Sequence, residues 1–123
     1  MDCYHILLNF MDCIFCNIAK GKFNTNFLYE DSEIIAFYDV NPQAPTHVLI
    51  IPRQHIVTIN DTDSKDELLL GKMILVAKQL AEQHHLKEPG YRLVFNVNSQ
   101  GGQAVYHIHL HLLGGRQMNW PPG

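Results

Sequence analysis

The segment YHIHLHLLGGR, residues 106–116, carries His107, His109 and His111, with one apolar residue between neighbouring histidines. Side chains at every second position share one face of a β-strand, whereas on a helix they would point about 200° apart. The segment therefore predicts a strand with a row of three imidazoles, spaced about 6–7 Å apart. Because the intervening residues are apolar, we expect them to face the core and the histidines to face solvent.

Three imidazoles in a row can serve three kinds of chemistry. Two of them with a further ligand could hold a catalytic zinc ion. They could also contact a phosphate, because glycine pairs at both ends of the row, Gly101 with Gly102 and Gly114 with Gly115, are typical of anion-binding turns. One neutral imidazole could instead act as a nucleophile near pH 7, with neighbours that orient it and supply protons. We favour an oxyanion or phosphate beside the middle imidazole.

A second group of candidate ligands lies near the N-terminus. Cys13 and Cys16 form a Cys-x-x-Cys pair, a spacing that is common in zinc sites. One such pair is half of a tetrahedral site, and two histidines could complete it. The chain has 3 cysteines, an odd number that argues against a disulfide framework and favours a reducing cytoplasm.

Two helices are predicted, one short and one long. Residues 13–21, CIFCNIAKG, predict a short helix that ends at Gly21, with Phe15 and Ile18 on one face. Residues 64–85 predict the long helix, which has acidic residues in its first turn. Its apolar side chains recur at spacings of three and four residues: Leu69, Met73, Val76 and Leu80.

The strands are indicated by alternation and by the turns between them. HVLIIP, residues 47–52, predicts a strand in which His47 shares one face with Leu49 and Ile51. Two short strands divided by a polar turn at 30–32 precede it, and a loop with two prolines follows them. The last two strands are predicted at 91–97 and 105–113. The expected fold class is α+β, an antiparallel sheet with one long and one short helix.

The composition excludes several kinds of protein. The 123 residues suffice for one domain, and 46% hydrophobic with 17% charged residues is typical of a globular chain. A formal net charge of −3 offers no basic surface to long nucleic acid. No apolar run approaches the roughly 20 residues that span a membrane, and the start, MDCYHILLNF, does not have the pattern of a signal peptide. We expect a disordered extension at 1–10 and a single domain at 11–123.

HIHLHLL resembles the His-x-His-x-His signature of the histidine-triad (HIT) family. AFYDVNPQAPTHVLIIPRQH, FNVNSQGGQAVYHIHLHLLGGR and the final WPPG resemble its Hint branch of nucleotide-binding phosphoramidases. The resemblance covers residues 12–123 and keeps the motifs in the family's order. It implies a homodimer that hydrolyses the P–N bond of purine nucleoside phosphoramidates, such as adenylated lysine, to give a nucleoside monophosphate and an amine. It implies no cofactor for that chemistry.

The resemblance also assigns roles to four histidines. His109 is similar to the nucleophile that becomes transiently nucleotidylated. His111 and His47 resemble the histidines that contact the phosphate and orient the nucleophile. His107 matches a residue that relays protons or holds its neighbours in the right tautomer.

Further residues match the family's nucleotide pocket. Asp39 is similar to the carboxylate that accepts both ribose hydroxyls, with Val40 beside it. Asn96 and Gln103 match polar contacts to the nucleotide and its leaving group, and Trp120 resembles a residue on the leaving-group side across the dimer. Apolar walls around the base are matched by Phe15, Ile18 and Phe37. The implied pocket also includes Gly102, Ala104 and Val105.

The sequence departs from the branch in two places. Ala104 stands where the branch usually has a serine, so one hydrogen bond to the phosphate or leaving group is missing. We expect this loss to lower the rate of hydrolysis without abolishing it. A set of bacterial family members shares the cysteine pair and binds zinc, with ligands that would match Cys13, Cys16, His55 and His107. We favour such a structural zinc, which would make His107 an orienting residue and leave the catalytic work to His109.

Two other functions stay open. One is a dinucleoside polyphosphate hydrolase of the sister branch, and the other is a nucleotide-binding regulatory protein with little turnover. The intact His109 argues against the second function, and Ala104 argues slightly for it.

Overall fold

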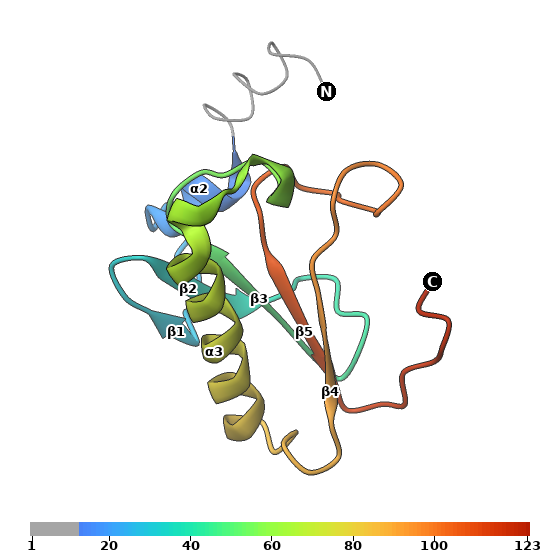
Figure 1. Cartoon of the computed structure of the whole chain (residues 1–123). Coiled ribbons are helices and arrows are strands. Elements are labelled where there is room, and N and C mark those ends of the chain that lie inside the picture. Colours follow the sequence, from blue (N-terminus) through green and yellow to red (C-terminus); the bar gives the residue numbers. More distant parts are fainter. Residues whose placement is uncertain (1–12) are drawn as a thin grey trace.

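The computed structural model describes residues 13–123 (Figure 1). The expected extension at 1–10 and the expected domain start at residue 11 lie outside the described residues. Five strands form one antiparallel sheet in the order β1-β2-β3-β5-β4. Their bounds are β1 Tyr29–Glu30, β2 Ile34–Tyr38, β3 Thr46–Pro52, β4 Tyr91–Val94 and β5 Leu110–Gly114. The predicted α+β class is confirmed.

The long helix α3, Glu67–Gln83, packs against one face of the sheet (Figure 1). Its buried side chains include Met73, Val76 and Leu80, three of the four residues that predicted the helix. The helix begins later than residue 64, because Ser64–Asp66 forms the 3-10 turn η2, which is capped by the Asp63 carboxylate. A second 3-10 turn, η1 (Ile59–Asp61), precedes it.

The two faces of the sheet bury different sets of side chains. Even-numbered residues of the central strands, such as Val48 and Ile50, join the core beneath α3. Odd-numbered residues, such as Leu49 and Ile51, form a second apolar cluster with the short helix α2, Ile14–Ala19. The alternation predicted for residues 47–52 is therefore correct, and both faces are covered.

The last two strands are shorter than predicted. β5 begins at Leu110, so His107 and His109 precede it instead of lying within it. The register pairs Ile50 with Leu110 and would bring residue 108 opposite Pro52, which has no backbone N–H to continue the ladder. The N–H of Ile108 donates instead to the carbonyl of Ile56 at 2.7 Å. β4 ends at Val94, opposite His111, three residues short of the predicted end at residue 97.

No helix within residues 13–123 combines the length and hydropathy needed to cross a bilayer.

Candidate active site

The histidines converge because of the strand register. Leu49 of β3 pairs with His111 of β5, so His47, two residues earlier on the same face, lies diagonally across from His111. The ring centroids of His47 and His111 are 5.1 Å apart, and those of His109 and His111 are 4.9 Å apart. The predicted row of imidazoles is therefore present, and β3 adds a fourth ring to it.

The expectation that the row faces solvent is wrong. His107 is 0% exposed and His109 is 6% exposed. The cover comes from Phe15 of α2, whose ring packs edge-on at 5.9 Å from His107 and 5.1 Å from His109. Alternation along a strand predicts two faces, but it contains no information about a helix 90 residues away in sequence that covers the polar one.

Backbone groups fix the tautomers of two catalytic candidates. His109 Nδ1 lies 2.8 Å from the carbonyl oxygen of His107, which can only accept, so Nδ1 carries the proton and Nε2 keeps a lone pair. The backbone N–H of Gln43 donates to His47 Nδ1 at 3.0 Å, so neutral His47 carries its proton on Nε2. Neither backbone partner has a signature in the sequence, and Gln43 was not among the predicted site residues.

The chain of hydrogen bonds ends at His111. His47 Nε2–H donates to His111 Nδ1 at 2.8 Å, so the proton of neutral His111 lies on Nε2. That N–H is buried and has no hydrogen-bond partner among the described residues. A buried N–H without an acceptor is costly, and a bound oxyanion would satisfy it.

The environment keeps these imidazoles neutral. Burial lowers the pKa of His109 below its ordinary value. Burial together with the neighbouring His109 and His47 lowers the pKa of His111 to about 4, despite the opposing effect of Asp39. Burial also lowers the pKa of His47, again against Asp39. Near neutral pH the site therefore holds a free lone pair on His109 and a free N–H on His111.

Asp39 lies at the same end of the row, just after β2. One carboxylate oxygen is 3.4 Å from His47 Nε2, and the other accepts the N–H of Asn41 at 2.8 Å. The carboxylate is partly exposed and can still accept further hydrogen bonds. Val40 beside it is fully exposed.

The apolar residues predicted to surround a base lie together. Phe15 and Phe37 are both buried, with ring centroids 5.9 Å apart in an edge-to-face arrangement. Ile18 and Val105 are partly buried against the same cluster. These side chains adjoin His109 through Phe15.

The remaining predicted pocket residues are spread more widely. Gln103 is buried, and its amide nitrogen donates to the carbonyls of Val57 at 2.8 Å and Val105 at 3.1 Å. Its amide oxygen accepts the N–H of Asn98 at 2.9 Å, so the side chain holds the glycine-rich turn together. Asn96 is partly buried, and the exposed residues are Gly102, Ala104 and Trp120.

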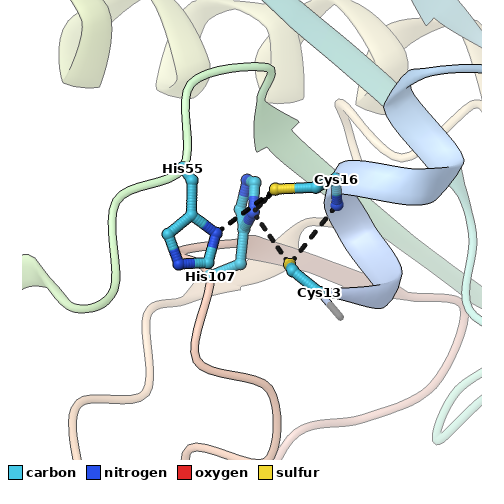
Figure 2. Close-up of side chains that lie close together, drawn as sticks. All are labelled: Cys13, Cys16, His55 and His107. Atoms are coloured by element: carbon cyan, nitrogen blue, oxygen red, sulfur yellow. Dashed lines mark hydrogen bonds between the residues drawn. The ribbon is translucent and has the colours of Figure 1, made fainter. Parts of the chain in front are cut away.

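The four predicted zinc ligands also meet, at the other end of the row (Figure 2). Cys16 Sγ lies 3.3 Å from His55 Nδ1 and 3.5 Å from His107 Nδ1, and Cys13 Sγ lies 3.3 Å from His107 Nδ1. His107 Nε2–H donates to the carbonyl of Pro52 at 2.8 Å, which leaves the Nδ1 lone pair directed at the sulfurs. His55 lies three residues beyond the end of β3.

The spacing of these atoms fits a tetrahedral ion. All four ligand atoms lie within 4.8 Å of one another. Zinc bonds of about 2.3 Å to sulfur and about 2.0–2.1 Å to nitrogen give S···N edges of about 3.5 Å in a tetrahedron. The two thiols and two imidazoles are soft and borderline donors of the kind that zinc prefers.

Comparison with known proteins identifies the family of this chain. The HIT domain model matches residues 20–118, which include the triad. The chain belongs to the HIT family. A HIT family hydrolase from Legionella pneumophila Philadelphia 1 is 61% identical, with a TM-score of 0.88 over 90% of this chain and 99% of that one. A histidine triad protein from Clostridium difficile is 37% identical, with a TM-score of 0.85 over 89% and 95% of the two chains.

A relative with a named activity is also similar over most of this HIT protein. The purine nucleoside phosphoramidase of Escherichia coli (strain K12) is 50% identical over 107 residues, which are 87% of this chain and 90% of that protein. The family resemblance inferred from the motifs is confirmed.

Proposed function

We propose that this HIT protein is a purine nucleoside phosphoramidase that cleaves the P–N bond of AMP–amine conjugates, such as adenylated lysine. The observation that carries the proposal is the pairing of a free His109 Nε2 lone pair with the unpartnered N–H of His111. A nucleophile beside a donor for a phosphoryl oxygen is the arrangement that this displacement needs. The 50% identity to the E. coli phosphoramidase supports it.

The reaction would proceed in two displacements at phosphorus. His109 Nε2 attacks the phosphorus, the P–N bond breaks, and the amine nitrogen takes a proton from solvent water as it leaves, which gives a nucleotidyl-histidine. Water then attacks the same phosphorus, the P–N bond to His109 breaks, and AMP is released. His111 Nε2–H stabilises charge on a phosphoryl oxygen in both steps, and His47 holds His111 in the required tautomer.

Residues on both sides of His109 would hold the nucleoside. The Asp39 carboxylate accepts hydrogen bonds from the 2′- and 3′-hydroxyls of the ribose, with Val40 alongside. The purine lies against the apolar group of Phe15, Phe37 and Ile18, which adjoins His109. Asn96, Gln103 and the turn at Gly102, Ala104 and Val105 border the phosphate and leaving group.

We further propose that the protein is a homodimer. β4 is an edge strand of the sheet and offers unpaired backbone groups. On the outer side of α3, Leu68 is 89% exposed and Leu75 is 64% exposed, one heptad apart. Exposed leucines and an open sheet edge each favour association with a second copy, which would bring Trp120 to the leaving-group side of the neighbouring site.

The Cys13, Cys16, His55 and His107 set would hold a structural zinc ion. The tetrahedral spacing of the ligand atoms supports this, and so does the His107 tautomer, whose Nδ1 faces the sulfurs. A closed Cys₂His₂ set ties α2 to the sheet and leaves no open position for substrate. His107 then orients the chain next to His109 instead of relaying protons. Reduced cysteines of this kind are consistent with a cytoplasmic protein.

A single-turnover experiment tests the proposed reaction. Enzyme in excess over an adenosine 5′-phosphoramidate should release the amine in a rapid step, and acid-labile AMP should be found on His109 in quenched samples. Diadenosine polyphosphate turned over faster than the phosphoramidate would favour the sister hydrolase activity. Tight AMP binding without amine release would favour a regulatory nucleotide-binding protein.

A further inference from the structure

We propose that ligation of a metal by Cys13 and Cys16 sets the position of Phe15, and that this couples metal loading to the affinity for the nucleotide. The inference rests on the proposed function and adds a regulatory link to its site. Phe15 lies between the two cysteines in the sequence, so the segment that carries both sulfurs also carries the residue that covers the nucleophile.

The short helix α2 depends on few attachments. It has 6 residues, far fewer than an isolated helix needs to be stable in water. At its start, the Cys13 sulfur accepts the N–H of Cys16 at 3.3 Å. At its end, Arg53 donates to the carbonyl of Ala19 at 2.8 Å. Between these ends the helix is held by the two sulfurs, which face His55 and His107, and by the apolar contacts of Phe15, Ile18 and Ala19.

Phe15 contacts each functional part of this face. Its ring lies 5.9 Å from the proposed metal ligand His107, 5.1 Å from the proposed nucleophile His109 and 5.9 Å from Phe37. It is buried, although it belongs to a one-and-a-half-turn helix at the edge of the described chain. A displacement of α2 would therefore remove the wall for the purine and expose His109 to water at the same time.

Metal binding changes how firmly α2 is held. Without the ion, the sulfurs contact the imidazoles only through weak S–H donors. With the ion, four coordinate bonds would join the same four atoms. These bonds form only when α2 lies against the sheet, which we call the docked state, so their free energy stabilises that state alone. Because AMP also favours the docked state, each ligand should raise the affinity for the other by the same factor, about tenfold for a coupling of ordinary size.

The test measures AMP affinity by titration calorimetry on the full chain, loaded with one equivalent of Zn²⁺ or stripped with a chelator. We expect the dissociation constant of AMP to rise about tenfold on stripping, with KM for the phosphoramidate rising in parallel and kcat changing less than about threefold. Amide hydrogen exchange of residues 14–19 should be faster in the stripped protein and slow again when Zn²⁺ is restored. Equal AMP affinity in the two forms would overturn the coupling.

Phe15→Ala tests whether the metal affects AMP binding through the Phe15 side chain or through the overall stability of the fold. In that variant AMP should bind more weakly, and its affinity should no longer depend on Zn²⁺. Phe27→Ala is the matched control, because Phe27 packs against the same cluster but is not flanked by the cysteines, and its tenfold response should persist. A Phe15→Ala protein that keeps the full response would show that the metal acts through overall folding and would overturn the role of Phe15.

The outcomes also separate this inference from the proposed function. A zinc-loaded wild-type protein that neither binds AMP nor releases the amine refutes the phosphoramidase, and the coupling with it. A loaded protein that binds and turns over normally, with a stripped form of the same affinity, refutes the coupling alone. The reciprocal measurement, Zn²⁺ affinity by chelator competition with and without saturating AMP, should give the same tenfold factor.

Discussion

The two ends of the histidine row have the same residue type and opposite chemistry. At one end, His107 donates from Nε2 to the carbonyl of Pro52 and directs Nδ1 at two sulfurs. At the other end, His111 accepts at Nδ1 from His47 and keeps a free N–H on Nε2. His109, between them, donates from Nδ1 to a carbonyl and keeps a free lone pair on Nε2.

The rings differ in which nitrogen carries the proton and in what that nitrogen contacts, because each ring has different hydrogen-bond partners. A backbone carbonyl selects which nitrogen of His107 and of His109 carries the proton, and a backbone N–H does so for His47. Under the proposed function, the same side chain would thus serve as a metal ligand, a nucleophile or a hydrogen-bond donor within five residues of one chain. Substitutions along the row should therefore have effects that differ in kind.

The largest effect is expected at the middle ring. His109→Asn should lower single-turnover amine release by at least about 10³-fold, because it removes the covalent path. AMP binding should persist, since Asp39 and the apolar walls remain. His85→Asn is the matched control: His85 is exposed and adopts φ 61, a conformation that asparagine tolerates. Near-normal activity in His109→Asn would show that another group is the nucleophile.

The next largest effect is expected from substitution of His111, the residue with the free N–H. His111→Ala should lower kcat by about 10²-fold, the usual consequence of losing one donor to a developing oxyanion. The substrate KM should change little, because the donor acts mainly in the transition state. Steady-state kinetics on the adenosine phosphoramidate measure both parameters. A rise in KM at unchanged kcat would instead assign His111 to ground-state binding.

Loss of the proposed metal ligands should lower the stability of the fold more than it lowers kcat. Protein purified without a metal-affinity tag should contain about one zinc per chain, and Cys13→Ala/Cys16→Ala should contain none. The double variant should melt at a lower temperature, while its kcat at saturating substrate stays near the wild-type value. Elemental analysis and thermal unfolding check these results. Metal-free wild type whose melting temperature does not respond to added zinc would return His107 to a proton-relay role.

The sequence predicted which face of its strand each histidine occupies, but it did not predict the burial of His109 or the tautomers of the rings. The alternation of residues 107–112 and the strand with His47 and Leu49 correctly gave the faces on which side chains lie, because strand periodicity is local. The burial of His109 was not predictable, because it depends on Phe15, which is distant in sequence. The tautomers were not predictable either, because their partners are backbone groups that every residue possesses.

A smaller effect is expected in the pH dependence of folding. The pKa of His111 is lowered from 6.5 to about 4 in the folded protein by burial and by the facing His109 and His47, with Asp39 opposing. Between those values the unfolded chain binds a proton that the folded protein does not, so stability is full above pH 6.5 and falls as the pH drops toward 4. Urea unfolding at pH 7 and pH 5 should show this loss. His111→Gln should lose less stability over the same interval, and an equal loss would exclude His111 as a cause.

The smallest effect is expected beside the row, at Ala104. This residue is exposed in the turn after Gln103, where the family resemblance leads us to expect a serine that hydrogen-bonds to the phosphate or leaving group. Ala104→Ser should raise kcat/KM for the phosphoramidate by at most about tenfold, the equivalent of one hydrogen bond to a charged group of roughly 1.5 kcal/mol. Ala104→Val adds apolar bulk without a hydroxyl and should give no gain. If the serine variant is no faster than wild type, another donor already fills that position, and the neighbouring backbone N–H groups of the glycine turn become the first candidates.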